Sequence, residues 1–169
     1  MTNEISIWDL DTVNSLEPVN KLIGHEDAVL DLSWNSNVRK LLASGSADHT
    51  CCLWDLETSQ VLNRFNHFKS NVQSIGFHPF EAQTLLMGDS NGNISIGDCQ
   101  STAFKTFKVC DSEIEKVIWN QYNPYFLLCS TSDGQVFCYD VRNTQKPVYS
   151  IGAHNDSVTG LSLRYSLLL

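Results

Sequence analysis

Short apolar runs, each divided from the next by small polar residues, recur along this chain. Within residues 24–56, three runs are rich in β-branched, aromatic or aliphatic side chains: 28–35, 40–46 and 51–56. Asn, Ser, Gly, Asp or His bounds each run, as is typical of short strands joined by tight turns. No segment of useful length shows the 3.6-residue period of an amphipathic helix. The pattern therefore predicts an all-β protein.

The same pattern repeats along the chain at one period. The first series is made of dipeptides 46, 43 and 42 residues apart: Trp8-Asp9, Trp54-Asp55, Gly97-Asp98 and Tyr139-Asp140. Two more series have spacings of 42 to 44 residues: His25, His67, Cys110 and His154, and Trp34, Phe77, Trp119 and Leu163. Three series that share a period of about 43 residues indicate a repeated structural unit.

Each complete unit predicts four strands separated by Gly, Asn, Asp or Pro. The whole units are predicted at 24–66, 67–108 and 109–152. Residues 1–23 form the end of an earlier unit, with strands expected at 5–10 and 18–23. Residues 153–169 begin a further unit with a single strand, expected at 157–163. The 169 residues are thus predicted to form one repetitive domain.

Gly-His followed by Trp-Asp at this spacing resembles the WD-repeat β-propellers. More narrowly, five segments resemble the periodic tryptophan protein 1 family: WDLDTVNSLEPV, GHEDAVLDLSWN, FHPFEAQTLL, TSDGQVFCYDVRN and AHNDSVTGLSL. The resemblance extends to about Leu163 and implies a propeller fragment, with three whole four-stranded blades plus partial blades at both ends. Propellers close with about 4–8 blades. We therefore expect a truncated product or partial gene model, with a short isoform as the alternative, and unpaired strand edges that favour aggregation.

His25, Ser44 and Asp48 have the residue types of a hydrolase triad, which needs an exposed nucleophile beside an oxyanion hole. The resemblance implies a structural relay instead. In it, the Trp54 indole donates to Ser44, Ser44 donates to one nitrogen of His25, and the other His25 nitrogen donates to Asp48. Later units replace relay members, by Met87, Asn91 and Gly97 in one and by Cys129 and Tyr139 in the next. The sequence therefore predicts no catalytic residue.

Two further motifs lack the context that chemistry requires. Residues 88–92 match G-x-S-x-G, but they align with the turn at 45–49 and no helix follows them. The six cysteines show no C-x-x-C spacing, and adjacent residues such as Cys51 and Cys52 point to opposite faces of a strand. We predict no metal, no cofactor and no small-molecule substrate.

The formal net charge of −8 argues against direct nucleic-acid binding, because phosphate contacts need clustered Lys and Arg. No apolar run reaches the length of a membrane span. The polar N-terminal residues lack the apolar region of a signal peptide, so we expect an intracellular protein with reduced cysteines.

The acidic residues are distributed unevenly over the predicted blades. Because strands alternate in direction, the turns fall on two faces. One face carries eight carboxylates against Lys69 alone, and the other carries eight against four cations. We predict that the first face binds a basic protein segment, such as a histone tail or a ribosomal protein. Its candidate contact residues are Glu26, Asp27, Asp89, Asp111, Glu113 and Asp156. In the alternative interpretation, these acids only solvate the face.

A second candidate interaction site is the box Tyr139, Asp140 and Arg142, which resembles the W/Y-D-x-R motif of substrate receptors in cullin-type ubiquitin ligases. This motif also arises whenever an Arg follows the third strand. The family resemblance implies a different function, that of a non-enzymatic scaffold in ribosome biogenesis. That role includes rRNA processing and ribosomal-DNA chromatin, with ribosome-assembly factors as partners. It further implies a nuclear or nucleolar location, with the cytoplasm open as an additional one.

Overall fold

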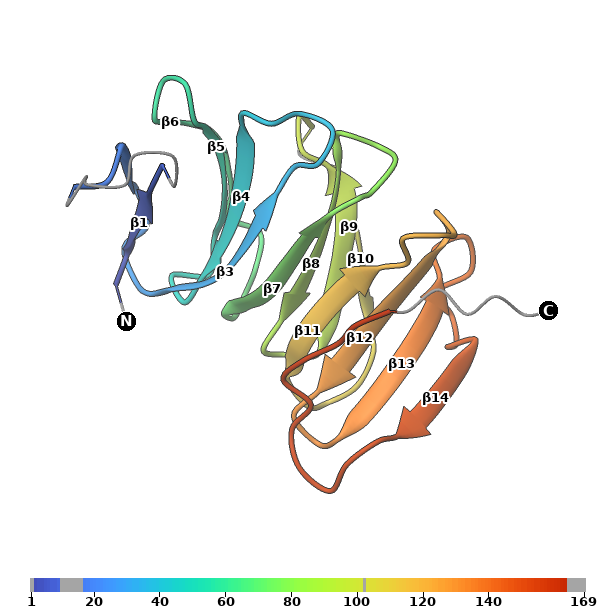
Figure 1. Cartoon of the computed structure of the whole chain (residues 1–169). Coiled ribbons are helices and arrows are strands. Elements are labelled where there is room, and N and C mark those ends of the chain that lie inside the picture. Colours follow the sequence, from blue (N-terminus) through green and yellow to red (C-terminus); the bar gives the residue numbers. More distant parts are fainter. Residues whose placement is uncertain (1, 10–16, 102, 164–169) are drawn as a thin grey trace.

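A computed structural model describes residues 2–9, 17–101 and 103–163, and its strands form four antiparallel sheets (Figure 1). The first sheet pairs β1 (Glu4–Ile7) with β2 (Asn20–Ile23). The second contains β3 (Val29–Trp34), β4 (Leu41–Ser46), β5 (Cys51–Asp55) and β6 (Gln60–Phe65). The third contains β7 (Val72–Phe77), β8 (Thr84–Asp89), β9 (Asn93–Asp98) and β10 (Phe104–Lys108). The fourth contains β11 (Ile114–Trp119), β12 (Phe126–Thr131), β13 (Gln135–Asp140) and β14 (Tyr149–Gly152).

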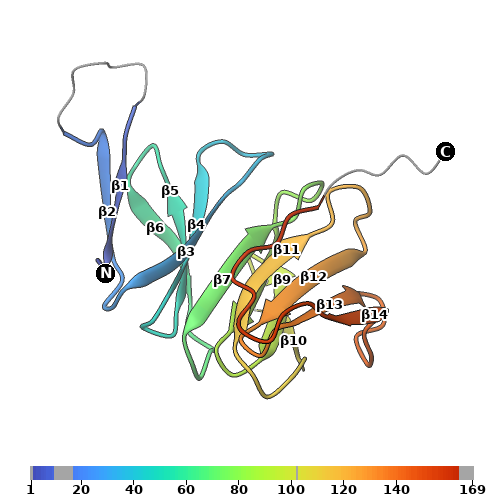
Figure 2. The ribbon, with the colours of Figure 1, turned by 60° about the horizontal axis from the view of Figure 1, so that its bottom comes forward.

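These sheets confirm the all-β prediction and the three four-stranded units. In each four-stranded sheet, strands adjacent in sequence are also neighbours in space, as in a meander joined by hairpin loops. Each sheet lies inside one of the ranges 24–66, 67–108 and 109–152. We call these sheets blade 1, blade 2 and blade 3, in chain order. The described residues form an open arc and not a closed ring (Figure 2).

One predicted strand is wrong. Residues 157–163 carry no strand, because none of the described residues offers them a second strand with which to pair. The segment instead follows the open side of blade 3 (Figure 1). There the backbone N–H of Val158 donates to Thr131 O at 3.2 Å, and the hydroxyl of Ser130 donates to Val158 O at 2.6 Å.

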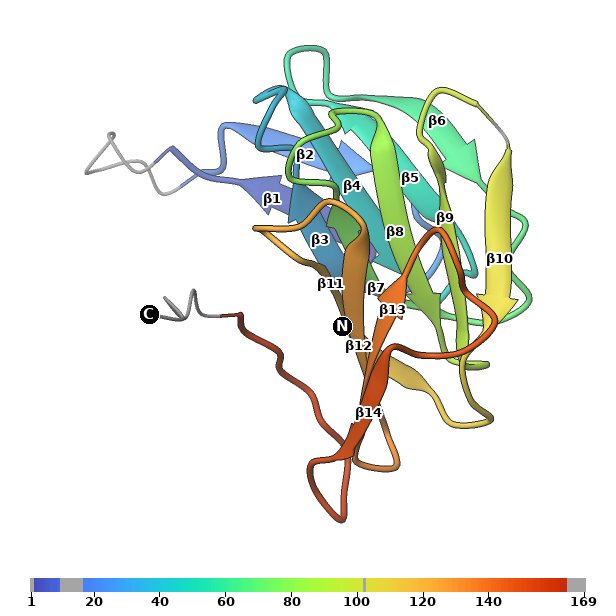
Figure 3. The ribbon, with the colours of Figure 1, turned by 90° about the vertical axis from the view of Figure 1, so that its right-hand side faces the viewer.

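The sheets pack face to face, with the first strand of each blade on the inside. Strand β7 contacts both β3 and β11, and these three inner strands lie together in Figure 3, with the outer strands β6 and β10 to their right. The second strands β4, β8 and β12 are buried along nearly their whole length. Neighbouring sheets cover both faces of β4 and β8, whereas the far side of β12 is covered by the segment that contains Val158. By contrast, β14 is exposed throughout.

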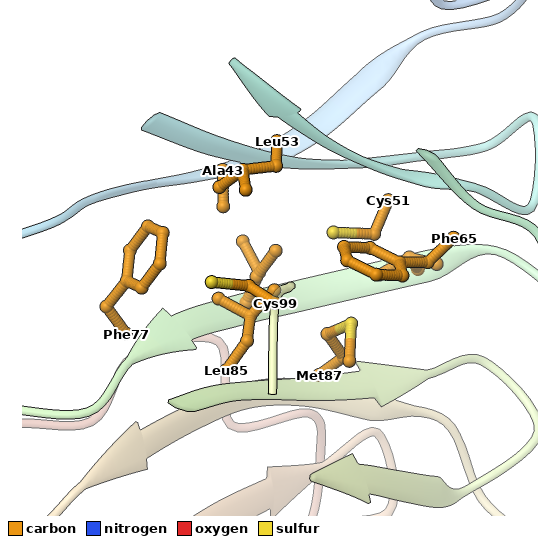
Figure 4. Packing of buried hydrophobic residues seen from close by; sticks show 10 residues of the cluster. Ala43, Cys51, Leu53, Phe65, Phe77, Leu85, Met87 and Cys99 are labelled. Atoms are coloured by element: carbon orange, nitrogen blue, oxygen red, sulfur yellow. The ribbon is translucent and has the colours of Figure 1, made fainter. Parts of the chain in front are cut away.

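The core is therefore divided into layers between adjacent sheets. Between blades 1 and 2, Ala43 and Leu53 face Leu85 and Met87, and Phe77 closes one end of the layer (Figure 4). A second layer between blades 2 and 3 contains Leu86, Ile94 and Trp119, among others. A third surrounds Trp54, between the two-stranded sheet and blade 1. Each blade is thus held mainly by burial of apolar side chains against its neighbours.

The turn between the second and third strands has the same backbone conformation in every blade. His49, Gly92 and Gly134 have φ values of 65°, 77° and 85°. At Gly92, a side chain would also overlap the carbonyl oxygen of Cys110. Glycine suits this left-handed position, whereas His49 adopts it at an energetic cost.

Candidate functional site

The four residues of the expected relay meet at one edge of blade 1. The Trp54 indole N–H donates to Ser44 Oγ at 2.8 Å. Ser44 Oγ lies 2.7 Å from His25 Nε2, and His25 Nδ1 lies 2.8 Å from Asp48 Oδ2. Because Ser44 accepts from the indole, its own hydrogen is available to Nε2, which leaves Nδ1 as the protonated nitrogen of a neutral ring. The relay joins the loop after β2, strand β4, the β4–β5 turn and strand β5.

Asp48 is held as a carboxylate by its neighbours. Burial alone would raise the pKa of Asp48, but hydrogen bonds from Thr50, the backbone N–H of Glu26 and His25 together lower it to about 2. The Thr50 hydroxyl donates to Oδ1 at 2.6 Å, and the Glu26 N–H donates to Oδ2 at 2.9 Å. A charged acceptor of this kind strengthens the hydrogen bonds that it accepts.

The relay geometry supports a structural role. Ser44 is fully buried and Trp54 is 1% exposed, so no substrate carbonyl can approach the serine oxygen. Each polar atom of the relay has a partner inside the blade, which is the arrangement that a buried polar network needs to be stabilising. Among the described residues, no three histidine, cysteine or acidic side chains come together in a group that could hold a metal ion.

In blade 2 the relay has been replaced by an aromatic stack. His67 lies parallel to Phe104, with ring centroids 4.7 Å apart, and 4.0 Å from the Phe68 ring. Gly97 holds the position of Trp54, and the Phe104 ring fills the space beside it so closely that a side chain at Gly97 would overlap the ring. Burial lowers the pKa of His67.

In blade 3, Cys110, Cys129 and Tyr139 hold the positions of His25, Ser44 and Trp54. They lie in the apolar layer between blades 2 and 3. Burial raises the pKa of Cys129 to about 12, so this thiol is a poor nucleophile and behaves as a small apolar side chain.

Five of the six acids predicted to bind a partner are exposed: Glu26, Asp27, Asp111, Glu113 and Asp156. They lie on the loops that lead into β3, into β11 and into the segment after β14. Asp111 is paired with Lys108 at 3.3 Å, and Glu113 accepts from Gln73 at 3.2 Å. Glu26, Asp27 and Asp156 have no ion pair with any residue that the structure describes.

The sixth acid, Asp89, does not belong to the exposed set. It is 5% exposed at the end of β8. Its Oδ1 accepts from the backbone N–H groups of Asn91 and Asn93, both at 2.9 Å, and the Asn93 amide donates to both of its oxygens. The carboxylate is turned inward because it satisfies donors in the β8–β9 turn.

The residues of the ligase-like box interact with one another. Tyr139 is 3% exposed within the layer between blades 2 and 3. Arg142 Nη2 lies 2.6 Å from Asp140 Oδ2, and the guanidinium lies 4.3 Å from the centre of the Tyr125 ring. Hydrogen bonds from Arg142 lower the pKa of Asp140 to about 2. The guanidinium remains largely exposed.

Sequence reasoning missed a set of links between the loops that follow the inner strands. Asn35, His78 and Asn120 are 43 and 42 residues apart, each directly after a member of the Trp34 series. Each accepts two backbone N–H groups of its own loop. Asn35 Nδ2 also donates to Ala82 O at 2.7 Å, and His78 Nε2 to Pro124 O at 3.0 Å. The period of these polar residues was the signal that could have revealed them.

An ion pair across the inner strands was also unforeseen. Lys116 Nζ on β11 lies 2.8 Å from Asp31 Oδ2 on β3, two blades away. The same oxygen accepts from the Ser74 hydroxyl at 2.8 Å and from the Ile75 N–H at 2.9 Å on the intervening β7. The free N–H groups of an inner edge strand are thus satisfied by side chains of the preceding blade.

Comparisons with known proteins agree with this architecture. Residues 16–55 match the family model WD40, described as "WD domain, G-beta repeat". The chain is 37% identical to the periodic tryptophan protein 1 homolog of Drosophila melanogaster, over 93% of this chain and 38% of that protein. It is 34% identical to periodic tryptophan protein 1 of Saccharomyces cerevisiae, over 81% of this chain and 25% of that protein.

A more distant relative is the histone acetyltransferase type B subunit 2 of Eremothecium gossypii, 25% identical over 92% of this chain and 37% of that protein. The chain therefore spans less than two fifths of the curated relatives that it matches. Its described residues include no helix of the length and apolar character needed to cross a membrane. The repeat period, the blade sheets and the matched residues together show that the chain is a WD40-repeat protein with similarity to periodic tryptophan protein 1.

Proposed function

We propose that this chain is a non-catalytic scaffold that binds basic protein segments through its acidic face, in a nuclear or nucleolar role in ribosome biogenesis. WD40 domains mediate protein–protein interactions, and the relay residues are used for folding. The observation that carries the proposal is that three exposed carboxylates of the acidic face, Glu26, Asp27 and Asp156, form no ion pair with any described residue.

The physical basis of binding is electrostatic. The formal net charge of the chain is −8, and exposed carboxylates on loops held by rigid blades keep their positions when a partner arrives. Clustered like charges raise the local concentration of an oppositely charged partner and accelerate its association. The Eremothecium gossypii relative is named as a subunit of a histone acetyltransferase, which supports a histone tail as one candidate partner. Ribosomal proteins are the other basic class.

Charge reversal on the full chain tests the proposal. A triple variant with Glu26→Lys, Asp27→Lys and Asp156→Lys is compared with a control of equal charge change on the other set of turns, Asp9→Lys, Glu57→Lys and Glu81→Lys. Affinity for a basic peptide is measured by fluorescence anisotropy at low and at physiological salt. We expect at least a tenfold loss for the first variant, a loss below threefold for the control, and weaker binding of the unmodified chain at higher salt. Equal losses in both variants would refute a role for this face.

Arg142 supports one alternative, a substrate receptor of a cullin-type ubiquitin ligase. Its guanidinium is largely exposed and is oriented by Asp140 and Tyr125. Co-purification of the ligase adaptor with the unmodified chain, abolished by Arg142→Ala, would favour this function. Co-purification of histones or ribosome-assembly factors that survives Arg142→Ala would favour the acidic face.

A further inference from the structure

The ring of His25 occupies a definite position in blade 1. It lies over the β4–β5 turn and the start of β5, where Nδ1 is 2.8 Å from Asp48, 3.3 Å from Thr50 Oγ1 and 4.0 Å from Cys52 Sγ. With Trp54 aligned to Gly97, the corresponding residues of blade 2 are Asn91, Asn93 and Ser95.

In blade 2 that position contains no ring. His67 has turned outward onto Phe104, at a centroid distance of 4.7 Å. Where the imidazole would lie, there is a cavity of about 330 Å³, lined by the three residues just named together with His67, Phe68, Lys69, Asp89 and Thr106. This volume is at the lower end of the range of about 300–1,000 Å³ that is typical of ligand pockets.

The lining favours a cation with several hydrogen-bond donors. The carboxyl group of Asp89 is buried, and among the described residues no lysine, arginine or histidine lies within ion-pair distance of it. Its Oδ1 accepts three hydrogen bonds, whereas Oδ2 accepts one, from the Asn93 amide. Ser95 Oγ and Thr106 Oγ1 are 2.8 Å apart and offer further acceptor sites. A buried charge is stabilised when a cation pairs with it.

We propose that this cavity receives one arginine side chain of a basic protein partner, which takes the place that the relay histidine takes in blade 1. A guanidinium is planar and weakly hydrated, so it can enter beside the His67 and Phe68 rings while its N–H groups point at Asp89 Oδ2 and the hydroxyl pair. A lysine ammonium, a compact and strongly hydrated point charge, matches this flat and aromatic site less well. The inference rests on the proposed function and names the anchor residue of the partner.

Lys69 lines the rim of the cavity and is exposed, with no ion pair among the described residues. Its positive charge opposes an incoming arginine but, on a flexible stem, it can move away. Lys69→Gln is therefore expected to strengthen binding of the arginine peptide about threefold. The same variant would weaken the binding of a phosphorylated ligand.

The test uses the full chain and two basic peptides of equal net charge. One carries a central arginine, and the other carries citrulline there with a compensating lysine elsewhere. Thr106→Phe blocks the cavity from the exposed strand β10, Thr106→Ser leaves it open, and Asp89→Asn removes the buried charge without changing the shape. We expect the arginine peptide to bind at least tenfold more tightly than the citrulline peptide. Thr106→Phe and Asp89→Asn should abolish that difference, and Thr106→Ser should keep it within twofold.

Direct binding of N-acetyl-arginine methylamide, followed through the backbone NMR signals of Ser95 and Thr106, separates this inference from the proposed function. If basic peptides bind through Glu26 and Asp27 but arginine and citrulline behave alike, the cavity has no arginine specificity and only the proposed function stands. If the small arginine probe binds and no basic peptide does, the cavity recognises arginine but the proposed binding of basic segments by the acidic face is wrong. Preference for O-phosphoserine methylamide over the arginine probe would overturn the inference in favour of an anion site.

Discussion

Replacing His78 by alanine removes a side chain that fastens blade 2 to blade 3. Its Nδ1 accepts the backbone N–H groups of Phe80 and Glu81 at 3.2 and 2.9 Å, and Nε2 donates to Pro124 O at 3.0 Å. The ring is 2% exposed and meets the Trp119 ring edge-on, with centroids 4.5 Å apart. The variant would leave these backbone groups unpaired and a void beside the indole.

The expected loss is about 2–4 kcal/mol of the free energy of unfolding. Each hydrogen bond contributes about 0.5–1.5 kcal/mol net, and a buried group left without a partner costs about 1–3 kcal/mol. His78→Asn is the matched control, because Asn35 and Asn120 perform the same task at the equivalent positions of the other blades. An asparagine at position 78 keeps an acceptor for both N–H groups and loses mainly the packing against Trp119, so we expect a loss of about 1 kcal/mol.

Urea unfolding followed by circular dichroism and tryptophan fluorescence measures both variants against the unmodified chain, with the slope m checked for constancy. The hydrogen-bond argument predicts that alanine is more destabilising than asparagine by at least about 1 kcal/mol. If the two variants lose the same stability within about 0.5 kcal/mol, the ring packing and not the backbone links holds these blades together.

Three further outcomes are expected in blade 1. Trp54→Phe should cost about 1–2 kcal/mol in chemical unfolding because it leaves the buried Ser44 hydroxyl without its indole donor. Trp34→Phe removes an indole hydrogen bond to Arg39 O at a half-exposed site, where water can replace it, and should cost less than about 0.5 kcal/mol. Since the pKa of Asp48 is depressed, its contribution of about 1–2 kcal/mol should be present above about pH 4 and lost as the pH falls toward 2, and Asp48→Asn should flatten that part of a stability–pH profile. His49→Gly should relieve the cost of a positive φ and raise the free energy of unfolding by up to about 1 kcal/mol, which is measured as a higher melting temperature. An unchanged or lower melting temperature would contradict the strain argument.

Much of the fold follows from local patterns. The strands Leu41–Ser46 and Cys51–Asp55 lie within the runs 40–46 and 51–56 that the sequence predicted, because turn residues bound each of these apolar runs. The relay geometry of His25, Ser44, Asp48 and Trp54 matches the network that the family resemblance implies. Residues 157–163 show the limit of such patterns, because a strand exists only where a second strand is present to pair with it.

Periodicity along the chain determined the repeat, the four-strand unit and the loops that carry the acids, since these depend on residue order and on turn chemistry. The tertiary structure decided which polar side chains face inward. Asp89 and Asp111 were both predicted to lie on the same face, yet Asp89, at the end of β8, is buried by the donors of the following turn and Asp111 remains in solvent.

The pairing of Asp31 with Lys116 depends on the stacking of three blades. The cavity beside Asn91 depends on which way the His67 ring turns, and that is set by the space that Gly97 leaves for Phe104. These contacts join residues far apart in sequence or depend on packing, so no local pattern contains them.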